Sequence, residues 1–149
     1  MDKICSSFII GKLTSTKSYA GPVGLDGHAL YLALCVNKTA HAMTGGAGGV
    51  VGGLLSYVGA KLFPATLDGP NACEFHQLPE EIQAAQLFRG LVSPNTTVLV
   101  IPRASVEKLV FSMMYGVRVE TRSGPYYLSL GPFSIGAAKR KFRSHGWLE

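Results

Sequence analysis

Short runs of apolar and β-branched residues divide the chain into predicted strands. Runs of this kind, typical of buried or half-buried strands, cover residues 4–14, 29–36, 96–101, 106–113 and 126–130. Before the last run, Val117, Val119 and Thr121 alternate with charged residues, so this strand should expose one face to water. Turns that contain Gly116 and Gly124 join the last three strands. The pattern therefore predicts a β meander, placed within residues 96–130.

The regions between these runs predict one helix and one loop. Pro79 suits the first position of a helix, and the acidic Glu80 and Glu81 suit the positive end of its dipole. We expect this helix to continue at helical apolar spacing and to stop at Gly90. Residues 19–27 are rich in glycine and proline, which predicts a loop.

A glycine-rich apolar segment, residues 40–63, interrupts the pattern. Gly45, Gly49 and Gly53 stand at GxxxG spacing, so on a helix they would form a flat face for close packing with another helix. Three alternatives are open: a transmembrane helix, a membrane-touching or self-associating helix, and a helix or loop packed on the sheet. Seven glycines within 45–59 each weaken a helix by roughly 0.8–1 kcal/mol relative to alanine, which favours the packed alternative.

The C-terminal region combines a predicted helix with most of the positive charge. Ser134 and Gly146 suit the cap and the stop of a helix over residues 134–144. The net charge of +5 arises entirely after Pro102, where eight basic residues accompany three acidic ones. A candidate surface for anionic partners is formed by Lys139, Arg140, Lys141 and Arg143.

The alternative for these four residues is an ordinary solvated helix face, because the helix dipole alone favours Lys and Arg near a C-terminus. Nucleic acid is disfavoured as the partner, because Phe142 is the only aromatic residue within the basic run. Binding by stacking on bases needs several aromatic residues among the charges. Anionic membrane lipid therefore remains the expected partner, beside self-association through the glycine-rich segment.

Composition limits the class of protein. With 149 residues the chain fits one domain, 47% of it is hydrophobic and only 15% is charged. These values exclude a disordered chain and a coiled coil. The mean hydropathy of +0.23 is high, which makes contact with a membrane worth considering.

Residues that would support catalysis or metal binding do not form a known motif. Cys5, Cys35 and Cys73 are far apart, which predicts reduced thiols in a cytoplasmic protein rather than disulfides or a zinc site. Cys73 and His76 form a single C-x-x-H pair without a second pair to complete a metal site. We therefore expect no enzyme activity, no cofactor and no metal.

The order of strands, an interruption, further strands and a closing helix resembles a pleckstrin-homology-like or GRAM-like small barrel. The resemblance lies in the hydrophobic patterns of residues 100–109 and 116–128, and in the Leu-Tyr-Leu run within 27–32. It implies a fold more than a ligand, because one fold hosts many functions. Two features depart from the family pattern: Trp147 lies beyond the last helix, and only Lys12 and Lys17 are basic in the first two strands and their loop.

Together these patterns predict a single α+β domain over residues 1–149, either a PH-like small barrel or a strongly bent antiparallel sheet. A C-terminal helix and a helical glycine-rich insertion would complete it. The function expected is that of a non-catalytic binding module at or near a membrane surface, in the cytoplasm. The alternative is a soluble protein-interaction domain in which the glycine-rich segment is packed internally.

Overall fold

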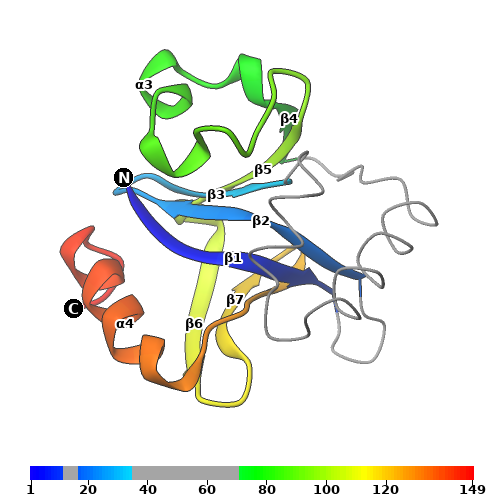
Figure 1. Ribbon diagram of the computed structural model, residues 1–149. Helices are drawn as coiled ribbons and strands as arrows, with labels where there is room; N and C mark the ends of the chain where they lie inside the picture. The colour runs from blue at the N-terminus through cyan, green and yellow to red at the C-terminus, as the bar shows by residue number, and fades with distance from the viewer. Residues whose placement is uncertain (12–16, 35–70) are drawn as a thin grey trace.

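The fold is an antiparallel sheet with a short C-terminal helix, shown in the computed structural model of Figure 1, which describes residues 1–11, 17–34 and 71–149. The strands are β1 (Asp2–Ile10), β2 (Lys17–Leu25), β3 (Ala29–Ala33), β4 (Ala72–Glu74), β5 (Thr97–Pro102), β6 (Val106–Ser112), β7 (Gly116–Thr121) and β8 (Gly124–Leu128). Their order in the sheet is β4-β5-β3-β2-β1-β8-β7-β6. The α+β class is thereby confirmed.

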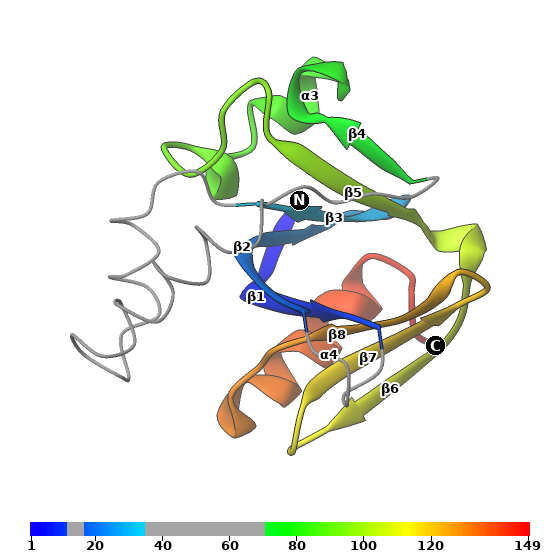
Figure 2. The ribbon, with the colours of Figure 1, turned by 90° about the vertical axis from the view of Figure 1, so that its right-hand side faces the viewer.

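The sheet is bent and open. Figure 2 shows β3, β5 and β4 in one wall and β8, β7 and β6 in the other, with β1 and β2 between them. Among the described residues, strands β4 and β6 are its two edges, so of the two expected architectures these residues form the bent sheet and not a closed barrel. The predicted meander is confirmed for β6, β7 and β8, in which Val117 and Val119 are buried while Arg118 is partly exposed.

The prediction of a loop over residues 19–27 is wrong, because most of this stretch belongs to β2. Glycine and proline fit the strand because of a β-bulge: Val23 pairs with Cys5 and Ala20 with Ser7, so two residues of β2 oppose one of β1. Those two residues are Gly21 and Pro22. At a bulge the missing N–H of proline leaves no hydrogen bond of the ladder unmade.

The predicted helix from Pro79 to Gly90 is also wrong in its length. Its residues form one turn of α-helix, α3 (Glu80–Gln83), and a 3-10 turn, η3 (Gln86–Phe88). The side chain of Gln83 donates hydrogen bonds to the carbonyl oxygens of Leu78 at 2.6 Å and His76 at 3.0 Å, which ties α3 to the turn before it. Phe88 then packs edge-on against Phe75 at 5.3 Å. Two short turns, in place of one longer helix, therefore bring the ring of Phe88 onto Phe75.

The C-terminal helix, α4 (Ile135–Ser144), confirms the prediction over residues 134–144. Ile135, Ala138 and Phe142 form its buried face. The chain leaves the helix at Gly146, whose φ of +76° is the left-handed conformation that favours glycine. Ser134 occupies the cap position, but its side chain makes no capping hydrogen bond, contrary to expectation.

Two apolar clusters hold the sheet together, one on each face. Leu30 and Leu32 of β3 point into the cluster that includes Phe142 of α4, whereas Tyr31 of β3 points into the cluster beneath η3 with Phe88. Successive residues of a strand face opposite sides, so β3 is buried on both. The helix α4 thus sits against a firmly packed sheet, which positions its basic residues.

Candidate functional site

The basic residues of α4 lie around the solvent side of an anchored helix. The ring of Phe142 is fully buried and packs edge-on against Phe111 of β6 at 5.6 Å and against Trp147 at 5.8 Å. The indole Nε1–H of Trp147 donates a hydrogen bond of 2.7 Å to the carbonyl oxygen of Asp26, which attaches the chain after α4 to the turn between β2 and β3. The helix therefore has a fixed orientation on the sheet.

Three of the four predicted site residues are held by contacts to other described residues, none of them an Asp or Glu side chain. The ammonium of Lys139 lies 5.4 Å from the centre of the Phe111 ring, a cation–π contact. The ammonium of Lys141 donates a 2.7 Å hydrogen bond to the carbonyl oxygen of Lys3. The Nε of Arg143 donates one of 3.3 Å to the carbonyl oxygen of Glu149.

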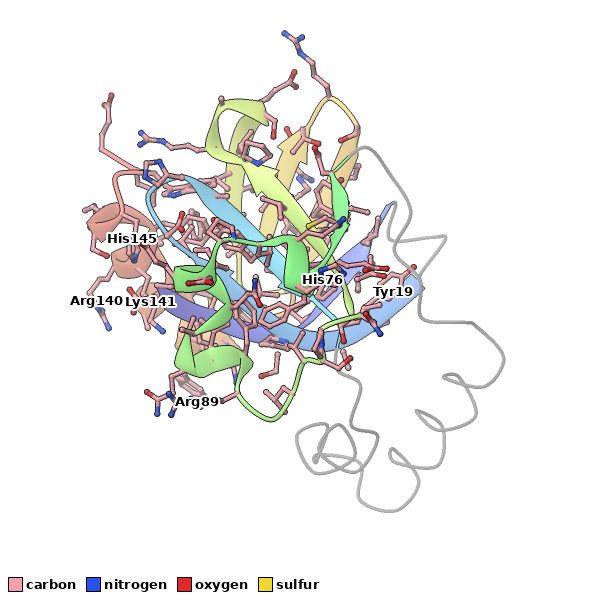
Figure 3. The ribbon with its side chains drawn as sticks, turned by 90° about the horizontal axis from the view of Figure 1, so that it is seen from above. Tyr19, His76, Arg89, Arg140, Lys141 and His145 are labelled. Atoms are coloured by element: carbon pink, nitrogen blue, oxygen red, sulfur yellow. The ribbon has the colours of Figure 1, made fainter. Side chains whose placement is uncertain are left out.

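Arg140 is exposed and makes no hydrogen bond or ion pair with any residue that the structure describes. Figure 3 shows Arg140 and Lys141 at the outer edge of the molecule. The ion pairs of the described residues instead join His76 with Glu74, Arg118 with Glu120, Arg122 with Glu107 and His145 with Asp2. No Asp or Glu side chain of the described residues pairs with the four basic residues of α4, and among the four Arg140 extends to solvent without a hydrogen bond to the described residues.

The glycines of the other predicted site, Gly45, Gly49 and Gly53, lie outside the described residues, as does the segment 40–63. Within the described ranges, no helix is long and apolar enough to cross a membrane. The helix-packing role of these glycines stays a prediction.

Exposed apolar side chains are a feature that the sequence analysis missed. Met113 and Met114 stand in the turn between β6 and β7, and Phe133 stands in η5 (Pro132–Ser134), just before α4. A signal was present in the sequence, since two consecutive methionines occupy a turn where glycine, asparagine, aspartate and serine are the usual residues.

A shallow groove of about 200 Å³ runs beside the edge strand β6. Its lining combines apolar and charged side chains of both signs: Arg103, Val106, Glu107, Lys108, Leu109, Trp147 and Leu148. The groove holds no histidine, cysteine or serine. Its ionisable side chains, Arg103, Glu107 and Lys108, are exposed, so the lining offers a contact surface of mixed charge.

The two described thiols and the Tyr31 phenol are poorly suited to chemistry at neutral pH. Burial raises the pKa of the Cys5 thiol to about 12, and burial also raises the pKa of Cys73. Burial and the neighbouring Asp26 carboxylate raise the pKa of Tyr31 to about 12. Each group is therefore protonated at neutral pH, whereas a reactive cysteine needs a lowered pKa.

The predicted C-x-x-H pair is not part of a larger cluster in the described chain. His76 contacts the carboxylate of Glu74, and both side chains are about half exposed. Across residues 1–11, 17–34 and 71–149, no three His, Cys, Asp or Glu side chains are close enough together to hold a metal ion.

Comparisons of this chain with protein-family models, with curated proteins and with solved structures find no match. The site must therefore be interpreted from its own geometry and charge.

Proposed function

We propose that this protein is a non-catalytic module that binds anionic membrane surfaces through the basic residues of α4. The observation that carries the proposal is the set of four basic side chains that have no Asp or Glu side-chain partner among the described residues, on a helix whose opposite face is anchored by Phe142. Each Lys or Arg close to an anionic leaflet contributes about 1 kcal/mol of attraction. A rigid helix presents these charges together, so little conformational entropy is lost when they meet a surface.

We also propose that the fold is PH-like or GRAM-like. Support comes from the two antiparallel meanders that meet at β1, from the Leu-Tyr-Leu run within β3 (Ala29–Ala33) and from the helix that follows the last strand. The open sheet and the position of Trp147 beyond α4 depart from the family pattern. The argument for membrane binding depends on α4 alone and stands without this likeness.

Vesicle sedimentation tests the proposed function. The full chain is incubated with phosphatidylcholine vesicles, with or without about 30% phosphatidylserine, at low and at physiological salt. We expect pelleting with the anionic vesicles only, weakened by salt because screening shortens the reach of each charge. Failure of the wild-type protein to pellet with anionic vesicles at low salt would overturn the proposal.

A charge-neutralised variant makes the test specific for α4. The helix variant carries Lys139→Gln, Arg140→Gln and Arg143→Gln, and leaves Lys141 to hold β1. Its affinity for anionic vesicles should fall by up to about 100-fold, at about 1 kcal/mol per charge. The matched control removes the same charge from exposed positions outside α4, with Arg89→Gln, Lys108→Gln and Arg122→Gln. Equal losses in both variants would show that only net charge matters.

A further inference from the structure

The largest exposed apolar side chains of the described residues are concentrated in two loops. Met113 is 72% exposed, Met114 94% and Phe133 100%, while the only other large apolar side chain of this kind, Met1, is 39% exposed. Single exposed apolar residues are ordinary, but three such residues in neighbouring loops form a contact surface. We call Met113, Met114 and Phe133 the apolar tip.

The two loops of the apolar tip lie side by side. Figures 1 and 2 both show the β6–β7 turn and the connection from β8 to α4 at the same end of the molecule, next to each other. Gly116, at the exit of the turn, lies so close to the end of β8 that a Cβ there would stand 2.2 Å from the carbonyl oxygen of Leu128 and 2.7 Å from the amide of Leu130. The Tyr115 and Tyr127 rings also pack edge-on at 5.6 Å.

Local hydrogen bonds hold both loops in the shape that displays the apolar tip. The backbone N–H of Met114 donates to Oγ of Ser112 at 3.1 Å, and the N–H of Ser134 donates to the carbonyl oxygen of Gly131 at 2.9 Å. The positive φ of Gly116, +93°, closes the turn. The exposed side chains are therefore presented by loops whose backbone is held by local hydrogen bonds.

The charge around the apolar tip selects its partner. No Asp or Glu occurs within residues 108–119 or 121–148. Glu120, the acid between these ranges, pairs with Arg118 at 2.9 Å. Lys139 extends toward β6 and lies over Phe111, two residues before the turn of the apolar tip. An apolar surface next to unpaired positive charge matches the boundary between acyl chains and anionic headgroups.

We infer that the apolar tip inserts into the interfacial region of an anionic bilayer while α4 contacts the headgroups. This inference rests on the proposed function and adds the orientation of the protein and a second, salt-insensitive contribution to binding. Amphipathic surfaces of this kind bury their apolar side chains about 5–10 Å into the headgroup and acyl boundary. The β6–β7 turn and η5 would therefore point into the membrane, and η3 would point away from it.

A triple variant tests the insertion by sedimentation with the same vesicles. Met113→Ser, Met114→Ser and Phe133→Ser change only exposed side chains, so the thermal midpoint should stay that of the wild type. Its affinity for anionic vesicles should fall by about 10- to 100-fold, because three apolar side chains no longer leave water. Its salt dependence should remain, whereas the helix variant of α4 should show a weaker salt dependence than the wild type.

The outcomes separate the inference from the proposed function. Wild-type affinity in the triple serine variant, together with salt-sensitive binding of the wild type, would overturn insertion and leave the basic surface standing. Salt-insensitive binding of the wild type to neutral vesicles, lost in the triple variant, would support insertion and overturn the electrostatic proposal. Self-association of the wild type without lipid, abolished in the triple variant, would assign the apolar tip to a second copy of the chain and overturn insertion.

Depth is measured with a tryptophan at the apolar tip. Met114→Trp is compared with Asn95→Trp, which lies in the exposed loop before β5, with wild-type Trp147 as the background in both. On vesicles with brominated acyl chains, the Met114→Trp signal should be quenched and blue-shifted, and the Asn95→Trp signal should stay at the background. Equal quenching of both variants while bound would overturn the assigned orientation.

Discussion

One half of the molecule, built by β2, β3 and β5, differs from the other half, built by β6, β7 and α4, in how completely its strands are buried. All five residues of β3 (Ala29–Ala33) are buried, because an apolar cluster lies on each face. In β6 (Val106–Ser112) no residue is fully buried. Charge differs too: six basic and six acidic residues precede Arg103, while eight basic and three acidic ones lie in residues 103–149. The first half supplies the stable support, and the second supplies the surface.

The largest expected effect comes from the buried strand. Leu32→Ala should lower the free energy of unfolding by about 2–5 kcal/mol, because it removes a fully buried side chain from the centre of β3. Val98→Ala in the neighbouring buried strand β5 and Val110→Ala in β6 remove the same two carbons, and Val110→Ala should cost less, below about 1 kcal/mol, since its side chain is partly exposed. Urea denaturation of the two valine variants measures the difference. Equal losses would contradict the division between the two halves.

A smaller effect is expected from two glycines with positive φ, one in each half. Gly90 has a φ of +71° with open space around it, so Gly90→Ala should cost about 1–2 kcal/mol, the penalty of a left-handed residue. Gly116→Ala adds a collision with the backbone of β8 and should cost more. Thermal unfolding provides the comparison. A Gly116→Ala protein as stable as Gly90→Ala would show that the start of β7 is not closely packed against the end of β8.

Alkaline pH should weaken the sheet through Cys5 of β1, which pairs with β2. Its pKa is raised from 9.0 to about 12 in the folded protein, because burial disfavours the thiolate. The unfolded chain releases this proton at lower pH, so the free energy of unfolding should fall by roughly 1 kcal/mol per pH unit between pH 9 and 12. Urea midpoints from pH 8 to 11 measure this decline. Cys5→Ala should make it shallower, and an unchanged slope would assign it to other groups.

The smallest effect is expected where the two halves meet. Trp147→Phe keeps a ring beside Phe142 but removes the donor to the carbonyl oxygen of Asp26, which should cost about 0.5–1.5 kcal/mol. Amide exchange should rise most near the turn between β2 and β3, which this bond joins to the C-terminal chain. Faster exchange confined to β6 and β7 would contradict this link.

The local sequence pattern was sufficient to predict an element where a single strand or helix buries one of its faces. The alternation of Val117 and Val119 with charges led to the correct strand β7, and the spacing of Ile135, Ala138 and Phe142 accompanies the correct helix α4. In both, the buried positions repeat with the period of the backbone, so neighbouring residues carry enough information.

The pattern failed where a distant contact decided the conformation. Gly21 and Pro22 look like a loop, but pairing with β1 places them at a bulge. Pro79 and the acids after it begin a helix, yet the packing of Phe88 on Phe75 accompanies two short turns in place of the longer helix. Long-range pairing and packing outweigh local propensity in both segments.

The candidate membrane-binding surface was likewise predictable from the sequence only in part. The amino-acid sequence by itself determined the α+β class, the meander, the C-terminal helix and its basic residues, because each depends on composition and short-range spacing. Only the tertiary structure decided that no Asp or Glu side chain of the described residues pairs with the four basic residues of α4, and that the β6–β7 turn, with its two exposed methionines, lies at the same end of the molecule as η5. Exposure and ion pairing depend on which segments, distant in sequence, lie next to one another in space. The folding of the sheet determines which segments these are.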